Sequence, residues 1–174
     1  MQSAMIVRDE AAGDASVIGE MTEAAFKTLA VSDQTEQFVI EALRAAKALA
    51  VSLVAERAGR IVGHVAFSPV TMSDGTPDWY GLGPVSVLPA CQRQGIGTAL
   101  IEEGLSRVRR LGARGCCLVG HPEYYGRFGF VRAEGLAHEG IPPEFFFVLP
   151  LAGPVPRGLV HFHPAFMAKG PQPA

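Results

Sequence analysis

The chain has 174 residues, with 15 lysines and arginines against 17 aspartates and glutamates and no run of like charge. This balance argues against nucleic acid or a membrane surface as a partner, and the apolar runs fall far short of the roughly 18 residues of a membrane-spanning helix. Three cysteines, two of them adjacent, make a poor disulfide framework, and nothing at the N-terminus resembles a secretory leader, so we expect a cytoplasmic protein. The length predicts one domain over 1–174, with a core of about 4–167.

The N-terminal part of the chain predicts a strand and two helices. A short strand at 5–7 precedes an apolar helical pattern, and Asp14 is expected to cap this helix. Further on, Asp33 and Glu36 have the spacing of a capping box, which predicts the start of a second helix.

Two β-rich runs follow, at 49–57 and 60–72. The dipeptide Ala58-Gly59 between them is a tight hairpin signal, so we expect the two runs to pair as antiparallel strands.

A strand, a turn and a helix between residues 82 and 111 form the central feature of the chain. The strand contains Val85 and Val87, and Pro84 is expected at an edge or a bulge because proline cannot donate to a β-ladder. The turn reads Gln92-Arg93-Gln94-Gly95-Ile96-Gly97-Thr98. Its glycines allow close backbone approach, and the free N–H groups at the following helix start favour an anion, so we expect a pyrophosphate here.

Two other glycine-rich phosphate motifs do not fit this turn. A P-loop needs Gly-Lys-Ser/Thr, which is absent, and a dinucleotide fingerprint needs a third glycine where this chain has Leu100. Beyond the helix, an apolar run at 115–119 predicts a buried strand, the segment around Tyr125 predicts a short helix, and 145–151 and 158–162 predict two last strands.

Two motifs resemble the GNAT superfamily of N-acetyltransferases. The first is the Gln/Arg-x-x-Gly-x-Gly pattern in the turn, and the second is the segment from Gly120 to Phe130, which carries Tyr-x-x-x-Gly-Phe. The motifs cover about 82–130, the flanking pattern extends the likeness over nearly the whole chain, and the Tyr-Tyr-x-Arg-Phe-Gly-Phe segment resembles a largely uncharacterised bacterial branch. The resemblance implies an α/β (α+β) fold in one domain, with a mixed, mostly antiparallel central sheet of about six or seven strands, flanking helices and a splayed slot for the cofactor.

The same resemblance implies an acetyl-CoA-dependent N-acyltransferase that moves an acetyl group to an amine of a small molecule or peptide by direct attack on the thioester. It implies cofactor binding by Val85, Val87, Gln92, Arg93, Gln94, Gly95, Gly97 and Thr98. A backbone N–H of one of the two valines is expected to meet the oxyanion. Tyr125 has the spacing of the tyrosine that protonates the departing thiolate, although aromatic residues in helices usually only pack.

The general base is left open by the sequence. The central strand has no glutamate at the position that many relatives use. The remaining candidates are His121, Asp78, Tyr80 or a water-mediated proton path, and an amine that is already neutral would need no base. His161-x-His163 has a metal-like spacing but no third ligand at a companion spacing, so no metal is expected.

Several alternatives therefore stand beside the main hypothesis. The chain could be a catalytically weak acyl-CoA-binding regulatory or interaction module, or it could transfer a longer acyl group or transfer to a hydroxyl from the same donor site. It could be a monomer or a homodimer. Arg127 and Arg132 are expected to be solvated or ion-paired and lie outside the predicted site. The acceptor groove is expected between the connection at 29–32 and the loop at 152–157.

Overall fold

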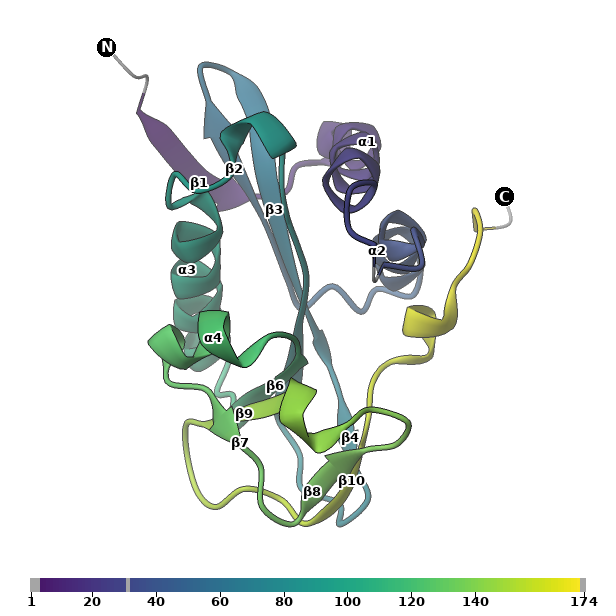
Figure 1. Cartoon of the computed structure of the whole chain (residues 1–174), viewed down its shortest axis with the longest axis vertical. Coiled ribbons are helices and arrows are strands. Elements are labelled where there is room, and N and C mark those ends of the chain that lie inside the picture. Colours follow the sequence, from purple (N-terminus) through teal and green to yellow (C-terminus); the bar gives the residue numbers. More distant parts are fainter. Residues whose placement is uncertain (1–3, 31, 173–174) are drawn as a thin grey trace.

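The computed structural model describes residues 4–30 and 32–172. A central sheet lies between two helical layers, with α3 on one face and α1 and α2 on the other (Figure 1). These helices span Ala15–Phe26 (α1), Glu36–Ala45 (α2) and Ile96–Arg110 (α3), and the short α4 spans Pro122–Tyr125. The helices thus cover both faces of the sheet, which lets strands such as β3 be buried along most of their length.

Seven strands form the central sheet in the described part of the chain, in the order β1-β2-β3-β5-β6-β9-β7. Neighbours are antiparallel except for β5 and β6, which are parallel. The strands span Met5–Asp9 (β1), Val51–Arg57 (β2), Arg60–Pro69 (β3), Trp79–Val87 (β5), Gly115–Val119 (β6), Phe146–Pro150 (β9) and Val131–Arg132 (β7). The predicted mixed, mostly antiparallel sheet is confirmed.

The hairpin between β2 and β3 forms where the sequence predicts it. Arg57 pairs with Arg60 across a two-residue loop, and the loop residues Ala58 and Gly59 have φ of +52° and +76°. Left-handed conformations at both central residues match the right-handed twist of the flanking strands.

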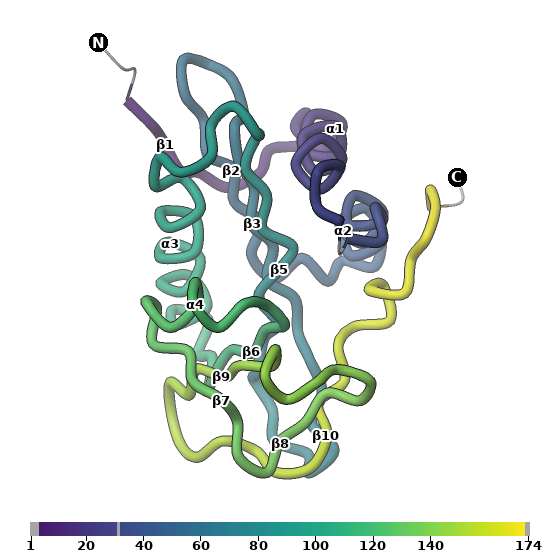
Figure 2. The backbone as a smooth tube through the Cα atoms, viewed as in Figure 1, coloured from purple at the N-terminus to yellow at the C-terminus, as the bar shows by residue number. Residues whose placement is uncertain are grey.

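The arrangement of the central sheet depends on β5. It is longer than the sequence predicts, and it pairs with β6 only from Trp79 to Gly81. Further along, β5 stays paired with β3, where Ala66 alone opposes the two residues Gly83 and Pro84, which are joined by a cis peptide bond. Pro84 therefore lies at a bulge, as expected, and within 4–30 and 32–172 the β6-facing edge of β5 has no strand partner beyond Gly81. The tube in Figure 2 shows β5 continuing upward past the end of β6.

The hydrophobic core lies on both faces of the sheet. Toward α3 it contains Phe67, Leu100 and Ile101, all fully buried. The ring of Phe67 comes so close to α3 that a Cβ at Gly104 would lie 2.2 Å from it. A glycine at this position therefore sets how closely the helix packs on the sheet.

A second, three-stranded sheet was not predicted. It has the order β4-β10-β8, formed by Thr71–Met72, Gly158–His161 and Leu136–His138. The predicted strand at 60–72 therefore breaks after Pro69, and the last predicted strand joins this sheet rather than the central one. Short 3-10 turns complete the chain at Ala12–Asp14, Pro89–Cys91, Gly126–Phe128, Pro143–Phe145 and Pro164–Met167.

Two predicted helix caps are wrong in detail. Asp14 lies at the start of α1, but its carboxylate accepts hydrogen bonds from the Ala11 N–H at 2.7 Å and from Arg8 at 2.8 Å instead of capping the helix. At α2, Glu36 makes its side-chain hydrogen bond with the Ser32 hydroxyl rather than within a capping box. In both places the carboxylate accepts from nearby groups outside the helix instead of from the helix N–H groups.

Candidate functional site

A hollow of about 590 Å³ lies at the free edge of β5, between the start of α3 and α4. It brings together eight of the nine predicted site residues, namely Val85, Val87, Gln92, Arg93, Gly95, Gly97, Thr98 and Tyr125. Segments that are about 40 residues apart in sequence thus share one cavity. The hollow therefore joins the strand edge, the glycine turn and the predicted catalytic tyrosine.

The glycine turn has the backbone that its sequence requires. Arg93 and Gly95 both have positive φ, at +63° and +83°, and α3 begins immediately after Gly95. The Gln92 side chain donates to the Val87 carbonyl at 3.3 Å, which ties the turn to the end of β5. The helix start is therefore held beside the free strand edge, where N–H groups without intrahelical partners are available to an anion.

Gln94 is the predicted site residue whose side chain lies elsewhere. Its side-chain oxygen accepts a hydrogen bond from Arg57 at 2.7 Å, and Gln94 is not part of the lining of the hollow. The side chain thus joins the turn to the β2–β3 hairpin.

Tyr125 is the last residue of α4, and its ring packs on Gly120, where a Cβ would lie 2.4 Å from it. The ring also meets Phe130 edge-on, with centroids 6.3 Å apart. Burial, with a smaller effect of Tyr124, raises the pKa of Tyr125 to about 12. The phenol therefore stays protonated at neutral pH, as a general acid must.

The hollow also contains two residues that the sequence analysis left out of the site. Tyr124 and Arg127 line it together with Tyr125. The Arg127 guanidinium lies over the Tyr124 ring, 4.6 Å from its centroid, and its Nε donates to the Tyr124 carbonyl at 3.0 Å. The spacing of three residues on a helical turn is the sequence signal that could have paired them.

The candidate bases lie outside this lining. His121 is an exposed N-cap residue of α4 with its ring edge-on to Phe145, at 6.0 Å. Asp78 is exposed just before β5, and Tyr80 lies in the strand where it pairs with β6. Within the described residues no cluster of three or more His, Cys, Asp or Glu side chains could hold a metal ion, the pair His161 and His163 included.

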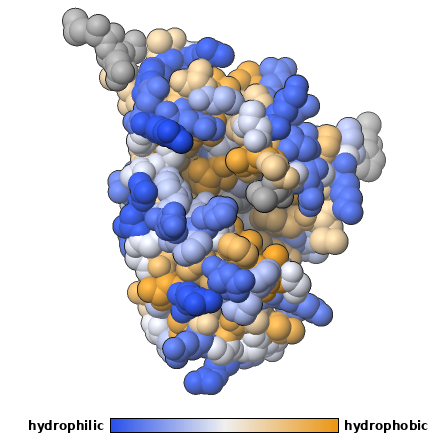
Figure 3. Space-filling model, viewed as in Figure 1, coloured by the Kyte–Doolittle hydropathy of each residue, from blue (hydrophilic) through white to orange (hydrophobic). Residues whose placement is uncertain are grey.

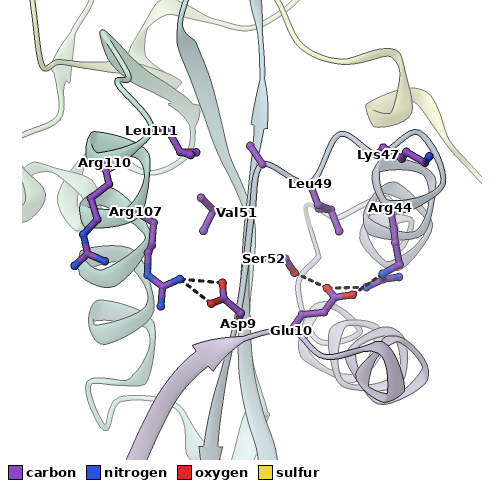
Figure 4. A pocket seen from close by; sticks show the side chains of 11 residues that line it. Asp9, Glu10, Arg44, Lys47, Leu49, Val51, Ser52, Arg107, Arg110 and Leu111 are labelled. Carbon is purple, nitrogen blue, oxygen red and sulfur yellow. Dashed lines mark hydrogen bonds and ion pairs between the residues drawn. The ribbon is translucent and has the colours of Figure 1, made fainter.

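A second hollow, of about 580 Å³, lies between the C-terminal ends of α2 and α3 (Figure 4). Two ion pairs lie in its lining. Arg107 contacts both carboxylate oxygens of Asp9 at 2.9 and 2.8 Å, and Arg44 contacts Glu10 at 2.6 Å. Because arginines already neutralise these carboxylates, we assign this hollow no ligand.

From Glu10 a polar chain leads into the interior between the sheet and α1. The Ser52 hydroxyl contacts the Glu10 carboxylate at 2.5 Å and His64 Nε2 at 2.8 Å, and His64 is fully buried. Since an ionised carboxylate only accepts, the serine proton goes to Glu10 and His64 Nε2 must donate to Ser52. His64 Nδ1 has no partner among the described residues.

The face drawn in Figure 3 is hollowed between the α1–α2 layer and α4, and hydrophobic side chains gather at the bottom of the depression. One side of the predicted acceptor groove is wrong. The loop at 152–157 lies at the end of the molecule away from α1 and α2 (Figure 2). There the Ala152 N–H donates to the Arg114 carbonyl, and the Arg157 N–H donates to the Asp74 carboxylate. The loop lies far from the predicted groove because it connects β9 to β10, and no local sequence pattern reveals this path.

A free strand edge that leads to a glycine-rich helix start, with the partly buried Tyr125 in the same hollow, suits an extended amide-bearing ligand that ends in phosphates, as coenzyme A does. The comparisons with known proteins agree. The family model described as "Acetyltransferase (GNAT) domain" matches residues 48–132. The N-acetyltransferase YhbS of Escherichia coli strain K12, itself described as uncharacterised, is 32% identical over 127 residues, which cover 72% of this chain and 73% of YhbS.

Two solved structures are similar over almost their full length. A GNAT family acetyltransferase from Brucella melitensis in complex with acetyl-CoA is 49% identical, with a TM-score of 0.85, and covers 94% of this chain and 99% of its own. Escherichia coli YhbS in complex with CoA is 30% identical, with a TM-score of 0.86 and coverages of 97% and 94%. The chain therefore belongs to the GNAT acetyltransferase family.

Family membership confirms the predicted enzyme class, an acetyl-CoA-dependent N-acetyltransferase, and the predicted fold. Among the described residues, none of the helices combines the length and apolar character that crossing a membrane requires.

Proposed function

We propose that the protein transfers the acetyl group of acetyl-CoA to an amine of a small molecule or peptide, by direct attack of the amine on the thioester carbonyl. The observation that carries this proposal is the edge of β5 beyond Gly81, which has no strand partner among the residues that the structure describes and leads to the glycine turn. The amide-bearing pantetheine arm pairs with the backbone of Val85 and Val87 as an added strand.

The cofactor's pyrophosphate lies at the turn and the first N–H groups of α3. The segment Gln92 to Thr98 holds it, with Gln94 included through its place in the turn, since its side chain is engaged by Arg57. Positive backbone dipoles at a helix start favour the negative phosphates.

In the reaction, the amine nitrogen forms a bond to the carbonyl carbon, and the carbon–sulfur bond breaks. A backbone N–H of Val85 or Val87 stabilises the oxyanion. Tyr125 gives its phenolic proton to the leaving thiolate and is reprotonated from solvent, and the proton lost by the amine passes to solvent. The partly buried position of Tyr125 in the hollow supports this role.

Calorimetric titration with acetyl-CoA and with CoA tests the donor site. Gly97→Asp is the matched loss variant, because a Cβ at Gly97 would lie 3.0 Å from the Tyr124 hydroxyl and the added carboxylate would repel the phosphates. We expect binding by the wild type and none by this variant. Thiol release in a screen of amines then identifies the acceptor class, whereas binding without release for any amine would favour a regulatory acyl-CoA-binding module.

A further inference from the structure

The donor hollow differs in charge from the other large hollows of the described chain. Its lining contains two guanidinium groups, Arg93 and Arg127, and among the described residues that line it there is no carboxylate. By contrast, the hollow between α1 and α2 contains three glutamates and one arginine. The hollow between α2 and α3 contains four cationic residues, but Asp9 and Glu10 line it as well and are ion-paired with two of them. The donor hollow is thus the large hollow in which arginines line the wall without a carboxylate beside them, which suits a doubly negative pyrophosphate.

Its two arginines come from different segments. Arg93 belongs to the glycine turn, whereas Arg127 lies in the 3-10 turn Gly126–Phe128 that follows α4. The Nε bond from Arg127 to the Tyr124 carbonyl and the stacking on the Tyr124 ring fix the guanidinium plane. The two terminal nitrogens of Arg127 take no part in that bond and remain available for a phosphate, in the geometry that favours two parallel hydrogen bonds.

Tyr124 brings a further donor to the same place. Its hydroxyl lies 3.0 Å from the position of a Cβ on Gly97, so it stands directly over the first turn of α3. A side chain at position 97 would crowd the hydroxyl. The Tyr124 ring also meets Phe128 edge-on, with centroids 5.6 Å apart, which holds the hydroxyl against the turn.

We propose that Tyr124 and Arg127 form the second wall of the pyrophosphate site, so that the diphosphate of the acyl donor is held between the glycine turn on one side and the end of α4 on the other. This inference rests on the proposed function. It adds two residues to the donor site and assigns Arg127 to the pyrophosphate rather than to the 3′-phosphate on the ribose. Tyr124 and Tyr125 then have separate tasks, one at the phosphates and the other at the sulfur.

Calorimetric titration with CoA and with 3′-dephospho-CoA tests the assignment. Arg127→Met is expected to weaken both ligands by a similar factor of roughly tenfold or more, the range of a hydrogen bond between charged partners. Arg127→Lys, which keeps the charge without the planar fork, is expected to lose less, and Tyr124→Phe to lose roughly three- to tenfold for both ligands. Arg132→Met is the control, because Arg132 is an exposed arginine of β7 outside this lining.

The outcomes separate the proposal from its alternatives. Loss of CoA affinity with unchanged 3′-dephospho-CoA affinity in Arg127→Met would overturn the assignment and place the guanidinium at the 3′-phosphate. Unchanged binding of both ligands, or an equal loss in Arg132→Met, would also overturn it. If the wild type binds neither ligand, the donor site of the proposed function fails as well. Melting curves of the ligand-free variants, expected to match the wild type, show that any loss is not due to unfolding.

Discussion

Protonation of the buried His64 should make the fold sensitive to mild acid. Burial, the largest effect, lowers the pKa of His64 from 6.5 to about 4, and the nearby Arg44 acts in the same direction, whereas Glu10 opposes them. The proton would have to go to Nδ1, which is buried without a hydrogen-bond partner among the described residues. Protonation therefore places a charged, unpaired N–H in the interior.

The lowered pKa of His64 determines the direction and the size of the change in the free energy of unfolding with pH. In the unfolded chain His64 takes up a proton as the pH falls below about 6.5, while the folded state does so only near pH 4, so the free energy of unfolding falls between these two values. At about 1.4 kcal/mol for each pKa unit, the loss is on the order of 3 kcal/mol. For a domain of this size that lowers the melting temperature by roughly 6–12 °C.

Glu10 acts in a lower pH range and can be separated from His64. Although burial alone would raise it, hydrogen bonds from Arg44 and Ser52 lower the pKa of Glu10 below its ordinary 4.5. The contribution of the ionised Glu10 carboxylate to the free energy of unfolding is therefore lost only as the pH falls below about 4.5. The range from pH 7 to 5 reports on His64.

Urea unfolding at pH 7, 6 and 5 measures the effect. His64→Gln keeps an amide donor for Ser52 but does not titrate, so its stability should change little over this range, while the wild type loses most of the expected amount. The exposed His161, changed to glutamine, is the control and should keep the wild-type slope. A wild type with constant stability from pH 7 to 5, or an equal slope in His64→Gln, would refute the reasoning.

Three substitutions test the packing and the chemistry. Gly104→Ala should destabilise the protein by about 1–3 kcal/mol, because its methyl group would meet the Phe67 ring at 2.2 Å. Gly19→Ala in α1, where a Cβ would meet nothing within 4 Å, should stabilise the protein by about 0.5–1 kcal/mol. Chemical denaturation measures both changes, and equal effects would contradict the packing argument. Tyr125→Phe should lower turnover by about tenfold or more while acetyl-CoA affinity stays near that of the wild type, measured by thiol release and calorimetry. Tyr80→Phe, outside the donor hollow, should leave turnover unchanged, and a Tyr125→Phe enzyme of full activity would exclude the general-acid role.

The sequence alone determined the features that depend on neighbouring residues. Ala58-Gly59 forms the predicted hairpin, and Pro84 lies at a bulge because a residue without an N–H cannot continue the ladder. The turn at 92–98 was recognisable because its glycines and the following helix start lie within a few residues of one another. Each of these is a local constraint on the backbone, so spacing and residue type suffice to predict it.

Only the tertiary structure decided which distant side chains meet. It brings Arg127 into the same hollow as Arg93, although the sequence analysis expected Arg127 outside the site. It also joins Glu10, Ser52 and His64, from three different strands or strand ends, in one polar chain that leads to the buried His64. Such contacts depend on strand order and on the splay of β5 from β6, and these are settled by packing of the whole sheet between its helices rather than by any local periodicity.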